Sequence, residues 1–372
     1  MDLNVLLISN GFQPNYEKAF ANGLAENGVD VELVSSDRTL IGELVPGVRA
    51  INLRGSQDPR RSHVEKVHNM LRYVLALACH IRRHRPAVVH LTGLFMTRSV
   101  AAGLAECLGL RLLSRRLFMT VHNVLPHDRH TRLNHLLYML IYRVPHKLVV
   151  HTESMKHTLT KRFEVSASRI VVMYHGTDAV PDEPQRVRAV HGVLHILLFG
   201  VLSPYKGTDL LLRALQLCPD LSVHVVIAGE CIRPDYADEV AELIAGVGRH
   251  HSVEWVRGFV PEDKVRDYFE SADVVVLPYR HIDQSGVLFT AFRFGTPVIA
   301  TDVGAFRESL PDFAGLICTD ATPEAIAATL VEFAERQDEF QRERIKQHGR
   351  TLAWPRTVRP LLEAYRQAAF SS

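Results

Sequence analysis

The feature that most restricts the fold is an alternation of short apolar runs with helical segments, which occurs in two series. The first series comprises the runs NVLLIS (4–9), VDVELVS (29–35), AVVHLT (87–92), LFMTVH (117–122) and KLVVHT (147–152). The second comprises HILLFGV (195–201), SVHVVIAG (222–229), VEWVRGF (253–259), DVVVLPY (273–279) and TPVIATD (296–302). Continuous apolar strands between helices are typical of parallel sheets covered on both faces. The pattern therefore predicts an α/β protein with two Rossmann-like domains.

A polar segment separates the two series. Residues 175–192 contain two prolines, three acidic residues and no apolar periodicity, which indicates an interdomain linker. We predict one domain over residues 1–178, a second over residues 193–352, and a final helix over residues 353–372 that crosses back to the first domain. Because ligands of such sheets bind at the carboxyl ends of the strands, we expect the chemistry in a cleft between facing domains.

Composition and charge narrow the classes of function. The chain has 372 residues, of which 47% are hydrophobic and 23% charged, as in an ordinary globular protein. Five scattered cysteines without a C-x-x-C pair favour reduced thiols in the cytoplasm over disulfides or a zinc site. The start MDLNVLLISNGF lacks a basic leader, and no apolar run approaches the roughly 18 residues of a membrane span. Residues 1–180 carry 23 Lys and Arg against 14 Asp and Glu, so this half is expected to face an anionic partner.

A turn in the second series has the features of a phosphate site. In FGVLSPYKGTDLLLRAL (199–215) a strand ends at Gly200, and a helix begins near Lys206 and Gly207. Glycine permits close approach of the backbone, a helix start offers free N–H groups and a positive dipole end, and lysine adds a cation suited to a diphosphate. The alternative is a surface lysine after an ordinary turn.

A second helix start lies in the same domain. Ser285 is a candidate N-cap for the helix that begins at Gly286, and the amides through Val287 and Leu288 are expected to point toward the same cleft. Taken alone, this is an ordinary strand–loop–helix segment. Two such helix starts at strand carboxyl ends predict a nucleotide site that binds phosphate.

Two loops of the first series are further candidates. His122 ends a strand and His127 follows in the proline-containing loop TVHNVLPHD. In SNGFQPNYEKAF (9–20) Gly11 follows the first strand, and the absence of G-x-G-x-x-G argues against an ordinary dinucleotide fingerprint. The alternatives are structural histidines and a simple strand–helix turn.

With these motifs, the sequence resembles the retaining glycosyltransferases of family 4, which have the GT-B fold. The resemblance covers nearly the whole chain and is strongest over residues 196–308. FGVLSPYKG matches the family turn whose lysine binds the donor diphosphate, here Lys206, whereas Val201 and Ser203 stand where an arginine usually helps. VVIAGE resembles the strand and turn at Gly229, and RGFVPEDKVRDYFESADVVVLPY resembles the segment leading to the base pocket.

The chain departs from the family at a pair of glutamates seven residues apart. Alignment through the Gly-Thr-Pro at residues 295–297 puts Ile282 at the first position and Thr290 at the second. A carboxylate lost there removes charge-assisted hydrogen bonds of roughly 1.5–3 kcal/mol each. Thr290 can supply one weaker bond, and Asp283 lies one residue from the first position. We therefore expect a variant donor site.

The resemblance implies a metal-independent, retaining hexosyltransferase that uses a UDP- or GDP-sugar as co-substrate and no other cofactor. The second domain would bind this donor and the first domain the acceptor hydroxyl. The catalytic residues implied are His122, Lys206 and Asp283. The donor-binding residues implied are Gly200, Ser203, Lys206, Gly229, Glu230, Phe259, Val260, Asp283, Ser285, Gly286, Val287, Leu288 and Thr290. The acceptor-binding residues implied are Asn10, Gly11, Phe12, Tyr16 and His127.

Two basic segments bear on the acceptor. Residues 60–86 and 111–119 carry nine arginines around apolar centres, as suits anionic lipid headgroups or lipid-linked diphosphates. We expect a cytoplasmic enzyme at the inner face of the membrane that extends a lipid-linked glycan in surface polysaccharide assembly. A small soluble acceptor and a catalytically silent scaffold partner are the alternatives. No nucleic-acid module is recognised, and an NAD oxidoreductase is disfavoured by the missing fingerprint.

Overall fold

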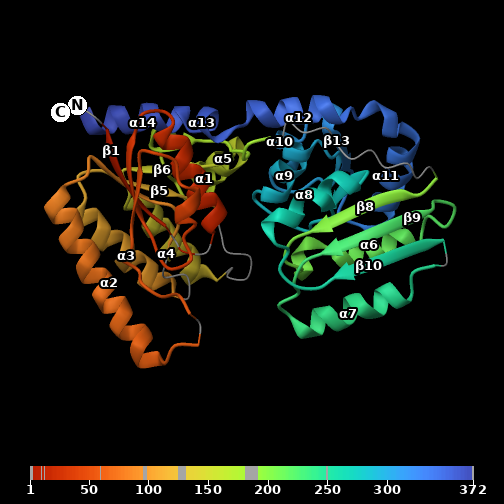
Figure 1. The fold of residues 1–372 in the computed structure, drawn as a ribbon, viewed down its shortest axis with the longest axis horizontal. Helices are drawn as coiled ribbons and strands as arrows, with labels where there is room; N and C mark the ends of the chain where they lie inside the picture. Colours follow the sequence, from red (N-terminus) through yellow and green to blue (C-terminus); the bar gives the residue numbers. More distant parts are fainter. Residues whose placement is uncertain are drawn as a thin grey trace. The chain divides into compact units, whose positions relative to one another are not determined.

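The computed structural model describes residues 3–9, 11, 13–58, 60–94, 99–124, 131–180, 192–248 and 250–370. The chain forms two compact units (Figure 1). The first comprises Met1–Gly176 and Trp354–Ser372, and the second comprises Thr177–Ala353. No helix in the described part of the chain is both long enough and apolar enough to cross a membrane.

The first unit contains a seven-stranded parallel sheet in the order β3-β2-β1-β4-β5-β6-β7. Its strands are β1 (Asn4–Ile8), β2 (Asp30–Val34), β3 (Val48–Ile51), β4 (Val88–Leu91), β5 (Leu117–Thr120), β6 (Lys147–Val150) and β7 (Ile170–Val172). Almost every residue of the central strands is buried, because helices cover both faces. This two-sided burial explains the continuous apolar runs in the sequence.

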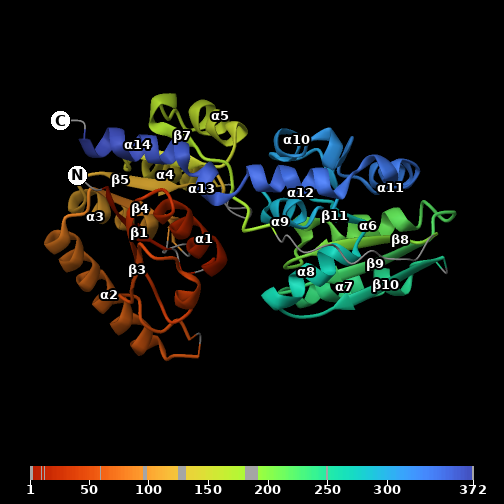
Figure 2. The same cartoon turned by 45° about the horizontal axis from the view of Figure 1, so that its top comes forward.

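The helices of the first unit form one layer on each face of the sheet (Figures 1 and 2). One core contains α1, α13 and α14, and the other contains α2, α3, α4 and α5. The helices are α1 (Pro14–Ala25), η1 (Ile41–Glu43), α2 (His63–His84), α3 (Val100–Leu113), α4 (Arg132–Arg143), α5 (Glu153–Arg162), η2 (Ala167–Arg169), α13 (Trp354–Thr357) and α14 (Arg359–Phe370). A capping box between Ser62 and Glu65 starts α2, the longest of them.

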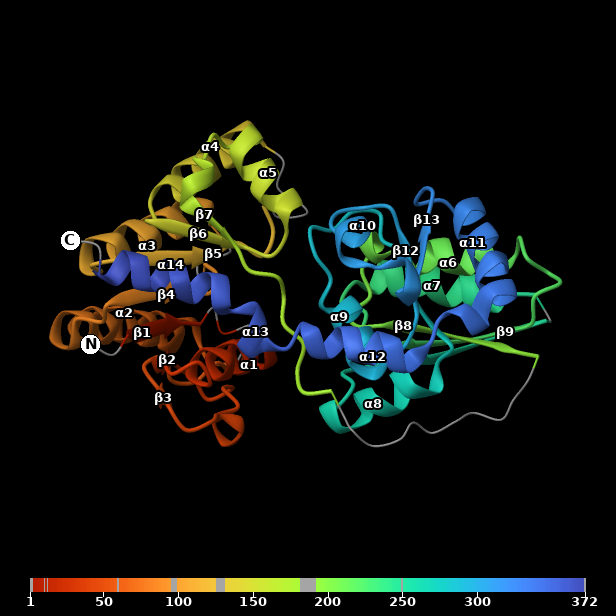
Figure 3. The same ribbon diagram turned by 90° about the horizontal axis from the view of Figure 1, so that it is seen from above.

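The C-terminal segment is part of the core of the first unit. Tyr365 on α14 is fully buried and hydrogen-bonds to His90 on β4. Arg116 donates from Nε to the carbonyl of Ala368 at 2.8 Å. A Cβ on Gly176 would lie 2.2 Å from a ring carbon of Trp354, so these two segments pack in direct contact. Figure 3 shows α14 alongside the first sheet.

The second unit contains a six-stranded parallel sheet in the order β10-β9-β8-β11-β12-β13. Its strands are β8 (Leu194–Phe199), β9 (Val223–Ala228), β10 (His251–Val256), β11 (Val274–Leu277), β12 (Val298–Thr301) and β13 (Gly315–Cys318). Its helices are η3 (Pro204–Lys206), α6 (Thr208–Leu215), α7 (Pro234–Ala245), α8 (Glu262–Ser271), α9 (Gly286–Phe294), α10 (Phe306–Ser309), η4 (Asp312–Ala314), α11 (Pro323–Arg336), η5 (Gln337–Glu339) and α12 (Arg342–Thr351).

Both sheets are doubly wound. The strand order reverses beside β1 in the first sheet and beside β8 in the second, which is the Rossmann arrangement. The prediction of an α/β protein with two Rossmann-like domains is confirmed. In each sheet the loops that follow the strands at this reversal are where ligands bind in such folds.

Candidate functional site

The turn after β8 holds a lysine in a confined position. Gly200 follows the strand with φ at +99°, and a Cβ added there would lie 3.0 Å from Nζ of Lys206. The same Nζ lies 5.7 Å from the ring centroid of the buried Tyr279. Burial lowers the pKa of Lys206 to about 8, and no carboxylate pairs with it in the described part of the chain. A desolvated cation without an anionic partner is suited to an anionic ligand.

Arg280, from the loop after β11, forms hydrogen bonds to the turn that carries Lys206. Its backbone N–H donates to the carbonyl of Tyr205 at 2.7 Å, and its Nη1 donates to the carbonyl of Pro204 at 2.6 Å. The guanidinium also pairs with both carboxylate oxygens of Asp209, at 2.9 and 2.5 Å. Although burial opposes ionisation, hydrogen bonds from Arg280 and Tyr236 hold the pKa of Asp209 below its usual range. The position of Lys206 therefore depends on an ion pair between the exposed guanidinium of Arg280 and the buried carboxylate of Asp209.

Gly207 allows the turn to approach the neighbouring strand. It has φ at +68°, and a Cβ on it would lie 1.9 Å from the carbonyl oxygen of Pro278. No side chain fits in that gap without moving backbone. Glycine is thus required for the lysine turn to contact the segment after β11.

The start of α9 meets Lys206 at the same corner. Cγ2 of Val287 lies 3.9 Å from the position that a Cβ on Gly200 would take. Ser285 makes no capping bond to α9, and its hydroxyl instead donates to the Tyr279 hydroxyl at 3.4 Å. The first amides of α9 thus have no side-chain acceptor at the N-cap, and the positive end of the helix dipole adds to the charge of Lys206.

The start of α6 differs from this pattern. Asp209 places its own carboxylate in the first turn, and its N–H donates to the Tyr236 hydroxyl at 3.4 Å. A carboxylate at this point already complements the helix dipole. Of the two helix starts expected to bind phosphate, α9 lacks such an acid and α6 contains one.

The loop between β11 and α9 is held by the turn after β12. A Cβ on Gly304 would lie 1.8 Å from the carbonyl oxygen of Ile282 and 3.3 Å from that of Asp283. The side chain of Ile282 packs against the hydrophobic core. Thr290 donates its hydroxyl proton to the carbonyl of Gly286 at 3.1 Å, within its own helix. Neither Ile282 nor Thr290 replaces the carboxylate expected at its position. Asp283 is the one carboxylate in the sequence from residue 282 to residue 290.

The remaining expected donor residues surround the ends of β9 and β10. A Cβ on Gly229 would lie 2.1 Å from the carbonyl oxygen of Gly200, so the loops after β8 and β9 touch. Glu230 is exposed, and Val260 is buried. Phe259 has an exposed fraction of 84%, which leaves a large aromatic face in solvent.

His122 belongs to a group of buried and half-buried imidazoles in the first unit. Its Nε2 donates to the carbonyl of Thr92 at 2.7 Å, and Nδ1 of His151 donates to the carbonyl of Met173 at 2.9 Å. The two other ring nitrogens face each other at 3.3 Å. When both rings are neutral, both facing nitrogens carry lone pairs, so the pair has room for one added proton. Burial lowers the pKa of His122 to about 4, which makes it neutral at pH 7.

Tyr16 lies against these rings. Its ring centroid is 4.8 Å from that of His122, 5.9 Å from that of His151 and 5.7 Å from that of His175. Burial lowers the pKa of His175 to about 4. Tyr16 was expected from the sequence to contact the acceptor. In the structure its side chain is buried and packs against the three histidine rings.

Two ionisable side chains, Glu17 and Arg54, are buried behind the end of β1. The N–H of Gly11 lies 2.9 Å from both Ser9 Oγ and Glu17 Oε1. A Cβ on Gly11 would lie 3.1 Å from Nη1 of Arg54, whose side chain is fully buried over the ring of Tyr73. Three expected acceptor residues, Asn10, Phe12 and His127, lie outside the described residues.

Three residues of these sites were not predicted as functional from the sequence. Arg54 and His151 each follow the carboxyl end of a strand, the same signal that identified His122. Arg280 also follows a strand, after Pro278 and Tyr279. Extending the strand-end rule to every strand would have found all three.

The two doubly wound units place this chain in the class of α/β proteins built from two Rossmann-like domains. Comparison with known proteins then identifies its family. The sequence model described as Glycosyltransferase Family 4 matches residues 15–180, and that described as Glycosyl transferases group 1 matches residues 194–336. Together the two matches cover most of the chain. The chain belongs to the glycosyltransferases of family 4.

Curated relatives agree with this assignment. The D-inositol 3-phosphate glycosyltransferase of Mycolicibacterium gilvum is 33% identical over 233 residues, which cover 60% of this chain and 52% of the relative. The protein of the same name from an Arthrobacter species is 27% identical over 390 residues, covering 95% and 89%. The chain spans about half the length of most of these curated relatives.

Two solved structures have the same fold. A glycosyltransferase from Rickettsia africae has a TM-score of 0.75 at 16% identity and covers both chains completely. Anabaena HepE in complex with UDP-glucose has a TM-score of 0.71 at 14% identity, over 97% of this chain and 100% of its own. At these identities the likeness establishes the fold alone.

Proposed function

We propose that the chain transfers a hexosyl unit from a UDP- or GDP-sugar to an acceptor hydroxyl, with retention of configuration and without a metal ion. The observation that carries this proposal is the meeting of Lys206, Gly200 and the start of α9 around one corner. A donor diphosphate placed there accepts hydrogen bonds from the amides of α9 and is neutralised by Lys206. The UDP-glucose complex of Anabaena HepE supports a donor of this type.

In the proposed reaction the bond from the anomeric carbon to the diphosphate breaks while the acceptor oxygen attacks from the same face. The acceptor proton passes to the departing phosphate oxygen. Lys206 and the amides of α9 stabilise the charge that develops on the leaving group. Neutral His122 orients the sugar, Asp283 accepts a hydrogen bond from it, and the exposed ring of Phe259 offers a stacking face for the base.

Thermal unfolding with a panel of nucleotide sugars tests the proposal. A ligand that binds only the folded chain at 100 times its Kd adds about 2.7 kcal/mol to the free energy of unfolding. We expect UDP- or GDP-sugars to raise Tm more than the matching adenine compounds, and the best donor to be hydrolysed or transferred. Failure of every uridine and guanine donor at millimolar concentration would contradict donor binding. Binding without hydrolysis or transfer would instead support a silent scaffold.

The acceptor that we propose is a lipid-linked glycan at the inner face of an anionic membrane. The support is a set of exposed apolar side chains on the helices of the first unit. These are Val64, Val67, Leu71, Val74 and Leu75 on α2, Leu108 and Leu112 on α3, and Leu133, Leu136 and Leu140 on α4. An apolar groove of about 300 Å³ runs between α2 and α3. Such a surface with flanking cations suits an anionic lipid layer.

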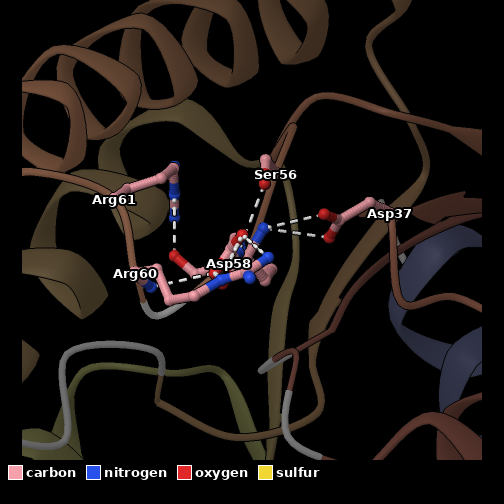
Figure 4. A network of polar contacts seen from close by, with 6 residues as sticks. Asp37, Ser56, Asp58, Arg60 and Arg61 are labelled. Atoms are coloured by element: carbon pink, nitrogen blue, oxygen red, sulfur yellow. Dashed lines mark hydrogen bonds and ion pairs between the residues drawn. The ribbon is translucent and has the colours of Figure 1, made fainter.

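The arginines at the two ends of α2 differ in whether their guanidinium groups are already paired within the chain or are exposed to solvent. Before α2, the guanidinium of Arg60 pairs with the carboxylate of Asp58 at 2.9 and 3.1 Å, and Nε of Arg61 donates to the carbonyl of Asp58 (Figure 4). At the other end, Arg82 and Arg83 are exposed. The C-terminal end of α2 thus carries more of the charge that would attract lipid headgroups.

Vesicle flotation tests this surface. We expect the chain to float with phosphatidylglycerol vesicles at low salt, and the pair Leu71→Glu with Leu75→Glu to reduce the bound fraction at least tenfold. Leu71 and Leu75 have exposed fractions of 61% and 66%, so their replacement leaves the core intact. Ile232→Glu, at an equally exposed site in the second unit, is the control. A wild-type chain that stays in the soluble fraction would contradict membrane attachment.

A small soluble acceptor is the second candidate, and the printed names of the relatives favour it. Proteins named D-inositol 3-phosphate glycosyltransferase match both units of this chain. A phosphorylated polyol would also be attracted by the excess of Lys and Arg in the first half. Transfer to inositol 3-phosphate in the absence of lipid would support this acceptor over a lipid-linked one.

A further inference from the structure

We propose that Glu32, His80 and His84 form a binding site for a divalent ion of the zinc class. The three side chains come from β2 and from the last turns of α2. One ligand atom from each lies within 4.8 Å of the other two. This site is distinct from the residues proposed for sugar transfer, and no motif in the sequence predicted it.

The geometry of the cluster is close to that of a coordination sphere. Nε2 of His80 lies 3.0 Å from Oε2 of Glu32. His80 and His84 are four residues apart on one helix face, and their rings stack at 4.2 Å with an interplanar angle of 24°. Zinc binds histidine nitrogen and carboxylate oxygen at about 2.0–2.2 Å, so ligand atoms around one ion lie roughly 3–3.5 Å apart. The ligand atoms of Glu32 and His80 already have this spacing. A small rotation of the His84 side chain would bring its ring nitrogen to the same distance.

The ligand types select the class of ion. Two imidazoles and one carboxylate suit zinc, cobalt, nickel or copper, whereas magnesium and calcium prefer oxygen ligands alone. The site also lies at the C-terminal end of α2, where the helix dipole favours a positive charge. Three protein ligands leave one tetrahedral position for water.

Neighbouring charges limit the affinity but leave the ligand atoms accessible. Arg49 pairs with Oε1 of Glu32 at 2.9 Å and lies 3.5 Å from Asp30, so Oε2 of Glu32 is the oxygen that faces His80. When an ion binds, Asp30 can continue to neutralise Arg49. The exposed cations Arg82 and Arg83 lie in the same helix turn as His84 and oppose the ion. We therefore expect micromolar rather than nanomolar binding.

An ion at this position would tie the end of α2 to the sheet. The ligands are separated by about 50 residues of chain, so binding constrains the unfolded state and stabilises the first unit. The alternative is a metal-free network in which Arg49, Glu32 and His80 are linked only by ion pairs and a hydrogen bond. Metal titration separates these two possibilities.

The experiment is a calorimetric titration of the chelator-treated chain with zinc, combined with measurement of the visible absorption of bound cobalt. Cys79 is exposed beside His80, so all variants are made in a Cys79→Ser background. We expect one equivalent of zinc with micromolar Kd, a visible cobalt spectrum of low coordination number, and a Tm that rises with zinc.

The variants identify the ligands. His84→Ala removes an exposed side chain and is expected to weaken zinc at least tenfold without changing the circular dichroism. His80→Ala and Glu32→Gln should do the same, whereas His68→Ala, at an exposed position elsewhere on α2, should bind like the parent. The proposal is overturned if the parent binds no zinc at micromolar concentration, or if His84→Ala and His80→Ala bind it as tightly as His68→Ala.

Discussion

Replacing Lys206 with methionine is expected to lower kcat/KM for the nucleotide-sugar donor by about 10²–10³-fold, the usual loss when one group that stabilises transition-state charge is removed. Methionine keeps the length of the side chain and removes the cation next to Gly200. The loss should appear both in turnover and in the thermal shift caused by the free nucleoside diphosphate. Lys264→Met, at an exposed position on α8, is the matched control and should behave like wild type.

The same variant should be more stable than the parent in the absence of donor. Burial lowers the pKa of Lys206 to about 8 in the folded chain, so below that pH the folded state holds a desolvated charge. Removing the charge is expected to add about 1–3 kcal/mol to the free energy of unfolding at pH 7. For the parent, stability should rise as pH increases from about 8 toward the unfolded lysine pKa, because the unfolded state then binds more protons.

Donor affinity has the opposite pH dependence. A bound diphosphate favours the charged lysine, so affinity for the donor should fall as pH rises through about 8. In Lys206→Met this dependence should vanish. Unchanged donor binding in the variant, or a Tm below that of the parent, would contradict the assignment of Lys206 as a desolvated anion ligand.

Replacing Arg280 with methionine is expected to lower the free energy of unfolding by about 2–4 kcal/mol, because it leaves the buried carboxylate of Asp209 without its cation. It also removes the hydrogen bond from the guanidinium to the carbonyl of Pro204, which helps to hold the turn that carries Lys206. We therefore expect donor affinity to fall along with stability, as measured by urea unfolding and by nucleotide titration.

A double variant separates the two effects of Arg280. Adding Asp209→Asn to Arg280→Met removes the unpaired charge, and the Tyr236 hydroxyl can still donate to the amide oxygen. Stability should then recover by about 1–3 kcal/mol through coupling between the two sites, whereas donor affinity should stay low. Arg307→Met breaks the exposed pair with Asp302 and should cost under about 1 kcal/mol. Equal losses from Arg280→Met and Arg307→Met would contradict a special role for Arg280.

Several parts of the proposed donor site could be predicted from local sequence. The turn from Gly200 through Lys206 to Gly207 was predicted because each glycine meets a requirement of its immediate surroundings, a positive φ in both cases. The start of α9 at Gly286 was predicted in the same way, from the segment that precedes it. The contact between Gly304 and Ile282 was not predicted, because it joins two different turns.

The sequence by itself determined the class of fold. A strand that is buried on both faces needs apolar residues at nearly every position, so near-continuous apolar runs between helices indicate two parallel sheets without any knowledge of contacts. The apolar run of each strand lies within that strand, so each strand can be predicted without knowing which other strands it contacts. Residues 175–192 lack any apolar periodicity, and the linker that this pattern predicts stays a prediction because residues 181–191 lie outside the described residues.

Only the tertiary structure decided which side chains meet. Arg280, from the loop after β11, reaches Asp209 at the start of α6 because β11 lies beside β8, and His151 faces His122 because β6 lies beside β5. Glu32 and His80 come together because α2 packs over the first sheet. Strand order and helix packing place residues that are tens of positions apart within hydrogen-bond distance, and no periodicity within a single element contains that information.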